Sequence, residues 1–415
     1  MARLAHGGRP RCATSVGSGS RPSDVDRSLM IEESSSRALR MGSVLPYPLS
    51  RHGADFAFET RAFEALDAMG RLWDGEFLVF SPGLTELAER PHTGYLRPPS
   101  ELPFTVVEVR PDLADLRDHP VDLVTGLLIP TSAPMLDIDA PAILTAELTY
   151  RTRLDIHRAE APVHILPRMA LGLARTELRF RSMVRRAAAV ECNGPAATRS
   201  YGRLARRSIS YRDHRLRRAD VEAAARVPAW DGARPLHVGF SGRHEAVKGP
   251  QFVVEVARRA HRAGLPVTFS IFGRGPLEQE LRAAAPPTVR FRGFRDFRTE
   301  WVADVQNEID VMMLPHVQGD PSCTYSESLG SGAPVLGFHN ETLTPLVKEH
   351  GIGWAVRRGD TDALYDRLTR LLESPEDLGA ARTAGLALVG SEPFEDLMDR
   401  RARFFRSVAL EEESA

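Results

Sequence analysis

Short apolar runs alternate with amphipathic helical patterns through the second half of the chain, and this alternation constrains the fold more than any other feature. The runs have strand length, and the segments between them repeat apolar residues at helical spacing. Strands that alternate with helices predict a doubly wound parallel sheet of the α/β class. We predict strands at 236–240, 267–271, 289–291, 311–314 and 334–338, and helices at 252–263, 277–285, 301–306, 364–372 and 394–408.

The first half of the chain is less regular, but the same alternation is visible. Because 415 residues exceed one ordinary core, two domains are expected. The segment 228–235, with two prolines and a glycine, has the composition of a linker between them. We predict first-domain strands at 44–49, 77–80, 104–109, 123–129, 142–146 and 187–192, and helices at 56–69 and 169–186.

The stretch 310–338 indicates where a ligand binds. It reads as a strand, a polar loop, a short helix around Glu327 and a second strand. In a parallel sheet, the loop after a strand and the N-terminus of the next helix favour phosphate, because unpaired N–H groups point there. Asp320 and Glu327 add carboxylates, which accept hydrogen bonds from hydroxyls. The pattern therefore predicts a ligand that is anionic at one end and polyhydroxylated at the other.

Four motifs in this half of the chain carry a family resemblance. They are G-R-x4-K-G at 242–249, F-G-x-G-P at 272–276, V-R-F-x-G-F at 289–294 and S-E-S-L-G-S-G-A-P-V at 326–335. Together they resemble the signature of the retaining glycosyltransferases of family 4, the group 1 transferases. The resemblance covers residues 235–373 well and the N-terminal half only loosely.

The resemblance implies a GT-B fold, in which two Rossmann-like doubly wound domains face each other across a cleft. It also implies an enzyme of bacterial glycan biosynthesis. We expect residues 1–42 to be a disordered tail or an over-extended start, 43–227 the acceptor-side domain and 228–235 the linker. The nucleotide-sugar-binding domain is then 236–390, and 391–415 forms a helix that crosses back to the first domain.

Glu327 is the central residue of the implied donor site, because its counterpart in the family holds the ribose of a nucleoside-diphosphate sugar. Gly53 is a position where backbone approaches a ligand closely, although an ordinary turn glycine explains it equally well. The expected donor-binding residues are Gly53, Gly242, Gly273, Asp320, Ser322, Cys323, Thr324 and Glu327.

Arg243 and Lys248 are the expected catalytic cations. The chain has only two lysines beside fifty-two arginines, so a lysine at position 248 is unusual for this sequence. Fixed cations stabilise the charge that builds on a departing diphosphate, and we expect neither a metal ion nor another cofactor. A solvated loop pair is the alternative. Glu147, expected at the end of a strand, is the candidate acceptor-facing group, or else a simple loop carboxylate.

The sequence departs from the family at one place. The family pattern is E-x7-E, but Gly319 stands eight residues before Glu327, with Asp320 next to it. Asp320 is therefore the nearest candidate for the sugar contact. The chemistry implied by the resemblance is front-face substitution with retention, in which the departing phosphate oxygen helps to deprotonate the acceptor hydroxyl.

Charge and cysteine content restrict the partners and the location. A net charge of −1 gives no global argument for nucleic acid. Three cysteines without metal-type spacing, and no apolar run of the ~20 residues that span a bilayer, favour the cytoplasm. Residues 168–220, however, hold fourteen arginines against four acidic residues. This segment is either a solvated basic surface or a peripheral contact with the inner face of a membrane.

The preferred interpretation is a glycosyltransferase that acts on a glycan, a lipid-linked sugar or a small molecule. A non-catalytic GT-B protein that binds nucleotide-sugar or a partner is the first alternative. A sugar-nucleotide epimerase or a phosphorylase of the same fold is the second. A NAD-dependent oxidoreductase fits least, because F-G-x-G-P lacks the dinucleotide fingerprint.

Overall fold

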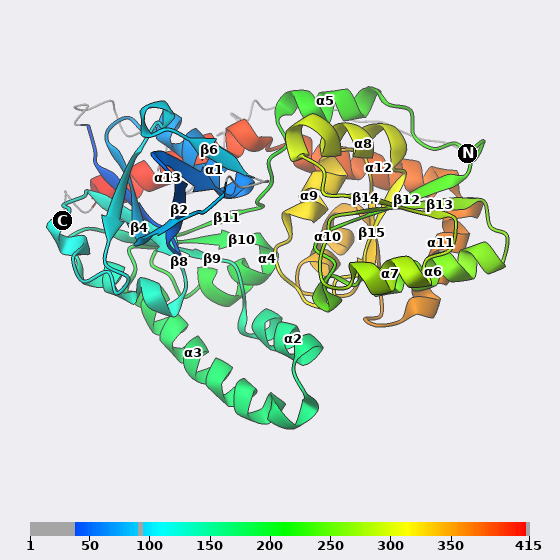
Figure 1. Ribbon diagram of the computed structural model, residues 1–415, viewed down its shortest axis with the longest axis horizontal. Coiled ribbons are helices and arrows are strands. Elements are labelled where there is room, and N and C mark those ends of the chain that lie inside the picture. The colour runs from blue at the N-terminus through cyan, green and yellow to red at the C-terminus, as the bar shows by residue number, and fades with distance from the viewer. Residues whose placement is uncertain (1–37, 90–93, 412–415) are drawn as a thin grey trace, which may run out of the picture. The chain divides into compact units, whose positions relative to one another are not determined.

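Two parallel sheets dominate the computed structural model, which describes residues 38–89 and 94–411 (Figure 1). The first 37 residues of the predicted tail 1–42 lie outside this range. Leu39 and Met41, near its end, are buried. From Leu39 onward the described residues form one compact unit.

The first sheet has seven strands in the order β11-β10-β9-β8-β1-β4-β7 among the described residues, and all neighbours run parallel. The chain winds outward from β1 in one direction and from β8 in the other, so the order reverses between these two neighbours. The strands are β1 (Met41–Val44), β4 (Phe77–Pro82), β7 (Thr105–Val109), β8 (Leu123–Leu127), β9 (Ala142–Ala146), β10 (Ala189–Asn193) and β11 (Ser208–Tyr211).

The predictions at 44–49 and 56–69 are wrong in detail. The first strand ends at Val44, because Pro46 and Pro48 follow it and cannot donate to a ladder. The chain then forms a hairpin that turns at Gly53, where φ is +61°. This hairpin belongs to a small sheet, β5-β2-β3-β6, that the sequence did not predict. Its strands are β2 (Leu49–His52), β3 (Asp55–Phe58), β5 (Leu84–Glu86) and β6 (Tyr95–Arg97).

The helix predicted at 56–69 begins later, as α1 (Thr60–Leu72), and the side chain of Glu59 caps it by accepting a hydrogen bond from the N–H of Ala62. The long arginine-rich helix and the remaining first-domain strands are confirmed, with small shifts at their ends. The other helices of this half are α2 (Tyr150–Glu160), α3 (Leu166–Arg186), α4 (Gly194–Ala197) and α5 (Arg218–Arg226).

The second sheet confirms the predicted alternation. Its six strands, counted over the described residues, run parallel in the order β14-β13-β12-β15-β16-β17. Numbered along the chain this order is 3-2-1-4-5-6, the order of dinucleotide-binding domains, with its reversal between β12 and β15. The strands are β12 (Leu236–Ser241), β13 (Val267–Phe272), β14 (Val289–Gly293), β15 (Val311–Leu314), β16 (Val335–Phe338) and β17 (Gly353–Val356).

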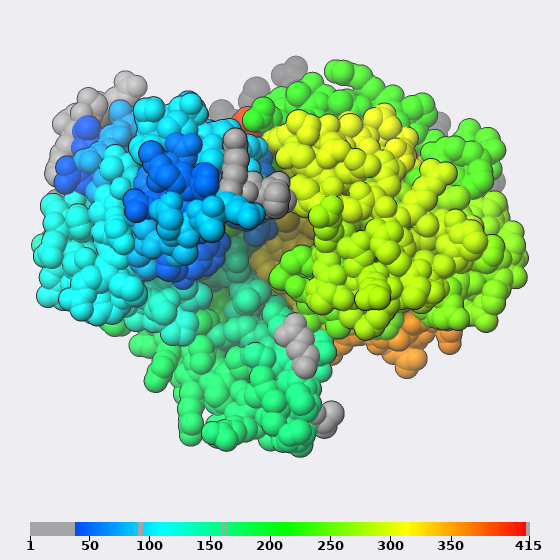
Figure 2. Space-filling model, viewed as in Figure 1, coloured from blue at the N-terminus to red at the C-terminus, as the bar shows by residue number. Residues whose placement is uncertain are grey.

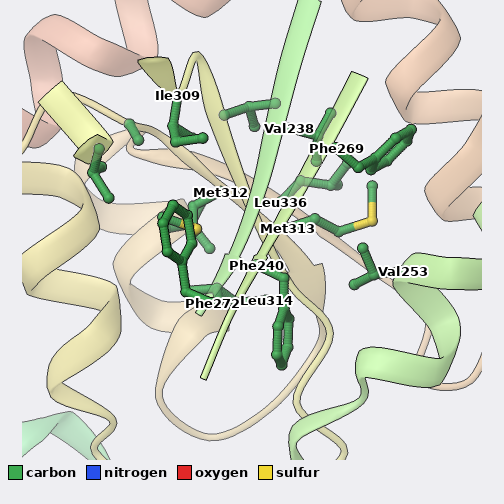
Figure 3. Packing of buried hydrophobic residues seen from close by; sticks show 14 of the residues in the cluster. Val238, Phe240, Val253, Phe269, Phe272, Ile309, Met312, Met313, Leu314 and Leu336 are labelled. Atoms are coloured by element: carbon green, nitrogen blue, oxygen red, sulfur yellow. The ribbon is translucent and has the colours of Figure 1, made fainter. Parts of the chain in front are cut away.

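Buried apolar side chains of adjacent strands hold the second sheet together. Figure 3 shows Phe240 of β12, Phe272 of β13 and Leu314 of β15 within one cluster. Asp360 caps α11, because its carboxylate accepts a hydrogen bond from the N–H of Ala363. The helices are α6 (Pro250–Arg262), α7 (Glu278–Ala284), α8 (Val302–Glu308), α9 (Cys323–Gly330), α10 (Leu343–His350), α11 (Thr361–Glu373), α12 (Pro375–Gly390) and α13 (Phe394–Glu411).

Helix α13 is covalently part of the second half of the chain but packs in the first domain. It lies against α1, and its buried residues Phe394, Met398 and Phe405 join the same apolar cluster as Met41 and Phe77 of the first sheet. The first domain therefore takes part of its core from the far end of the described chain.

Candidate active site

The reversal point of the second sheet positions the candidate donor site. Gly242 and Arg243 follow β12, and the loop that leads into α9 follows β15. Since β12 and β15 are neighbours whose connections leave in opposite directions, a crevice opens outside their carboxyl ends. Ligands of open α/β sheets bind at such crevices.

Close backbone packing shapes one wall of this crevice. A Cβ atom added to Gly273 would lie 2.0 Å from the carbonyl oxygen of Gly242, and Gly273 has a φ of +106°. No other residue type fits this approach without moving the backbone. The loops after β12 and β13 are thus fixed against each other.

A cleft of about 450 Å³ occupies the crevice. Glu59 and Thr60 of the first domain line it together with residues of the second domain. It brings together six of the predicted site residues: Gly242, Arg243, Gly273, Cys323, Thr324 and Glu327.

Glu327 lies on α9 with its carboxylate buried. Oε1 of Glu327 accepts a hydrogen bond from Nε of Arg215 at 2.9 Å. The guanidinium of Arg215 also stacks over the ring of Phe297, 3.7 Å from its centroid. A buried carboxylate with a cation on one oxygen keeps its other oxygen available for a ligand hydroxyl.

Arg215 is the site residue that sequence reasoning missed. It lies in the loop between β11 and α5, lines the cleft, and is 112 positions from Glu327. The arginine-rich segment 168–220 contains it, but nothing in the sequence distinguishes it from the other arginines of that segment.

Lys248 and Asp320 do not line the cleft but pair with each other beside it. Nζ of Lys248 donates to Oδ2 of Asp320 at 2.6 Å. Burial alone raises the pKa of Asp320, but the charge and hydrogen bond of Lys248 outweigh it and hold that pKa below its usual range. His316 is itself buried, and burial followed by the nearby ammonium lowers its pKa to about 3. The three side chains form a buried polar cluster in which His316 is neutral.

Cys323 begins α9 and faces the first domain. Its Sγ accepts a hydrogen bond from Nη1 of Arg61 at 3.1 Å. Burial, followed by the carboxylate of Glu327, raises the pKa of Cys323 to about 12, so the thiol stays protonated at neutral pH. A protonated thiol is a poor nucleophile. Ser322 is the N-cap residue of α9 and does not line the cleft.

Neither Glu147 nor Gly53 lines the cleft. Glu147 directly follows β9, as predicted, and accepts a hydrogen bond from Nδ2 of Asn193 at 3.3 Å. Burial raises the pKa of Glu147, and the neighbouring Asp213 carboxylate adds to the rise. Glu147 lines a separate cavity in the first domain. Gly53 is the turn residue of the β2–β3 hairpin and lines neither space.

Over the described residues, no group of three His, Cys, Asp or Glu side chains is arranged to hold a metal ion.

Comparison with known proteins relates the second domain to glycosyltransferases. The family described as "Glycosyl transferases group 1" matches residues 235–374. The amylovoran biosynthesis glycosyltransferase AmsK of Erwinia amylovora is 26% identical over 171 residues, which are 38% of this chain and 41% of the relative. The 2-deoxystreptamine glucosyltransferase of Streptomyces kanamyceticus is 25% identical over 158 residues, 37% of this chain and 41% of the relative. These matches span less than half of the length of the curated relatives.

Solved structures resemble more of the chain. WaaG, a glycosyltransferase involved in lipopolysaccharide biosynthesis, has a TM-score of 0.58 at 12% identity, over 88% of this chain and 99% of WaaG. Anabaena HepE in complex with UDP and glucose has a TM-score of 0.56 at 14% identity, over 89% of this chain and 99% of HepE. The chain therefore has the GT-B fold, two Rossmann-like domains that face each other across a cleft. Its second domain, over residues 235–374, is similar to the group 1 glycosyltransferase family.

Proposed function

We propose that this protein transfers a sugar from a nucleoside-diphosphate sugar to a hydroxyl acceptor, with retention and without a metal ion. One observation carries the proposal: six residues predicted from the family motifs meet in one cleft at the reversal point of the second sheet. The biosynthetic role in the name of AmsK supports a place in glycan synthesis.

The donor fits the cleft by charge and shape. The free oxygen of Glu327 is the ribose ligand, and Arg215 offsets the charge of that carboxylate. Arg243, whose side chain is 70% exposed and pairs with Glu245 at 2.9 Å, supplies a cation for the diphosphate. Phe294, 49% exposed, lines the same cleft and offers a face on which a nucleobase stacks. HepE, whose structure contains UDP and glucose, supports this class of donor.

The leaving group needs a second cation, and Lys248 is placed to provide it. Lys248 lies at the end of the loop that Gly242 and Arg243 begin, but its ammonium is engaged by Asp320. A donor diphosphate competes with that carboxylate for the ammonium, so donor binding and release of Lys248 are coupled. Asp320, once released, is the candidate contact for the donor sugar. The departing phosphate oxygen then takes the acceptor proton, as in the family that the motifs resemble.

We also propose that α3 contacts an anionic membrane surface. Leu171 and Leu178 are 54% and 69% exposed, and Arg175 and Arg179 are exposed beside them. The green spheres at the bottom of Figure 2 belong to α2 and α3 and lie at the surface. Exposed leucines flanked by arginines favour the interface of an anionic bilayer. In 38–89 and 94–411, no helix has the length and apolar character to span a bilayer.

A thermal-shift series with UDP, GDP, ADP, CMP and NAD tests the donor assignment. A nucleotide at about 100 times its dissociation constant stabilises a protein by about 2.7 kcal/mol, which is readily measured. One nucleoside diphosphate is expected to raise the melting temperature, and Arg243→Ala is expected to remove the response. Arg226→Ala, an arginine whose side chain is 78% exposed far from the motifs, is the matched control. If no nucleotide stabilises the chain, the proposed function is wrong.

Binding of nucleotide-sugar without transfer is the second candidate, and one observation favours it. Lys248, the expected catalytic cation, is neutralised by Asp320 and lies outside the cleft. Release of free nucleoside diphosphate from a bound donor in the presence of acceptors distinguishes the two. Stable donor binding with no release over any acceptor supports the non-catalytic candidate.

A further inference from the structure

The first domain contains a cavity of about 490 Å³ that the donor site does not use. Val44 and Leu45 at the end of β1, and Thr125 and Gly126 of β8, line it. β1 and β8 are the neighbours between which the strand order of the first sheet reverses. One end of the cavity therefore lies at the ligand-binding crevice of the first domain, and Met41 and Phe77 line its continuation along the sheet. Its volume is in the range of pockets for small ligands.

The walls of this cavity are mostly apolar and come from two helices. Ala62, Ala65 and Leu66 line it from α1, and Met398 and Phe405 line it from α13. The spacing of the α1 residues places them on one helical face. The two alanines leave room that larger side chains would fill. A space of this kind favours an apolar occupant, because burial removes its surface from water.

One end of the cavity is polar. Glu147 and Asp213 lie there with Arg61, whose Nη1 is 3.6 Å from Oδ2 of Asp213. A second pair lies deeper, where Arg401 donates to both carboxylate oxygens of the buried Glu191, at 2.7 and 3.0 Å. The deep pair is internally neutral, whereas the two carboxylates of Glu147 and Asp213 share one guanidinium, that of Arg61, and so keep oxygens that accept hydrogen bonds from a ligand.

The polar end faces the donor cleft. Glu59 lines both the cavity and the cleft. Arg61, two residues on, reaches across to Cys323, which lines the cleft. A ligand whose polar group lies at Glu147 would therefore present that group toward the donor, while its remainder extends between α1 and α13.

We infer that the acceptor is amphipathic, with a hydroxyl-bearing head at Glu147 and Asp213 and an alkyl or aryl body in the cavity between α1 and α13. This inference rests on the proposed function, because it names the acceptor of the same reaction. A lipid-like chain and a compact ring share this chemistry.

A homologous series of 1-alkanols, from butanol to octanol, tests the inference with probes that have only a hydroxyl and an apolar body. Isothermal titration calorimetry with UDP present is expected to show affinity rising roughly fourfold with each methylene that becomes fully buried. The rise stops when the chain fills the cavity. 2-Naphthylmethanol is the ring probe. Tighter binding of the ring than of octanol indicates a compact body, and the reverse order indicates a chain.

Two variants in which a larger side chain fills the cavity, called the filled variants, and one control variant show where the alkanols bind. Ala62→Leu and Ala65→Leu extend side chains into the cavity, and each is expected to abolish the dependence on chain length while UDP still binds. Arg71→Leu places the same side chain on an exposed position of α1 outside the cavity and is expected to preserve the dependence. If the wild type binds UDP but gives equal affinities across the alkanols and the ring, the inference is overturned. The same holds if the filled variants behave like Arg71→Leu. Loss of UDP binding by the wild type is a different result, which concerns the donor site alone.

Discussion

Nζ of Lys248 lies 2.6 Å from Oδ2 of Asp320, so this ion pair engages the ammonium that we propose for the leaving group. Lys248→Ala is expected to weaken UDP binding by about 10- to 150-fold, because a hydrogen bond to a charged group contributes about 1.5–3 kcal/mol. Asp320→Asn removes the competing charge and is expected to tighten UDP binding. Calorimetric titration measures both. Lys348→Ala, at the only other lysine, is the control. Weaker binding by Asp320→Asn would contradict the competition.

His316 makes the stability of the protein depend on pH. The folded state keeps it neutral down to about pH 3, while the unfolded chain binds a proton near its ordinary pKa of 6.5. Stability is therefore lost as pH falls from 6.5, by up to about 1.4 kcal/mol per pH unit. His316→Gln is expected to make that loss shallower between pH 6.5 and 5 in urea unfolding. Exposed His350→Gln is the control, and equal slopes in all three proteins would refute the assignment.

Arg215 and Glu327 form a pair with little exposure, 13% and 5% of their side chains. Arg215→Ala leaves a buried carboxylate without its cation, and we expect a loss of about 3–5 kcal/mol of stability. The double variant Arg215→Ala with Glu327→Gln should lose less than the sum of the single variants, because the stranded charge is gone. Urea unfolding measures the cycle, and additive losses would show that the two side chains do not interact.

Gly273 tests the backbone contact between the loops after β12 and β13. Gly273→Ala is expected to destabilise the protein and to weaken UDP binding, since its Cβ would collide with the carbonyl of Gly242. Gly379→Ala is the matched control, because nothing lies within 4 Å of its Cβ and it is inside α12. That change is expected to stabilise by up to about 1 kcal/mol. Thermal unfolding measures the stability of both variants, and titration with UDP measures their affinity. Equal results for the two variants would contradict the proposed contact.

Membrane contact by α3 is tested by flotation with vesicles that contain anionic lipid. Replacing Leu171 and Leu178 by serine, or Arg175 and Arg179 by glutamine, is expected to reduce binding. Each arginine contributes about 1 kcal/mol near such a surface, so the second pair should cost roughly 30-fold in affinity. Leu72→Ser, at a leucine 42% exposed on α1, is the control. Equal flotation of all variants would exclude α3 as the contact.

The second domain could be predicted closely from the sequence because most of its elements are specified by residues that lie close together in the chain. Most strands and helices there are specified by their own spacing of apolar residues, and the cap at Asp360 by a single side chain, whereas β17, α10 and α12 were not predicted. The hairpin around Gly53 could not be predicted in the same way. Phe56 and Phe58 fit both a helix and a strand, and the pairing of β3 with β2 and β6 selects the strand.

The candidate site was predictable where motifs name residues and not where distant segments meet. Glu327 and Arg243 lie in the cleft as the motifs suggest. Arg215 contacts Glu327 only because the loop after β11 passes beside α9, which no local pattern encodes. The pairing of Lys248 with Asp320 depends likewise on two loops that are separate in sequence but lie together in space.

The packing of α13 on α1 has a consequence for how the protein is made. Domains usually fold in the order in which the ribosome releases them. Here the first domain emerges early, yet Phe394, Met398 and Phe405 complete its core only after the whole second domain has been synthesised. A nascent chain must therefore hold an open apolar surface on α1 until its last helix arrives, and an interrupted translation product would keep that surface exposed.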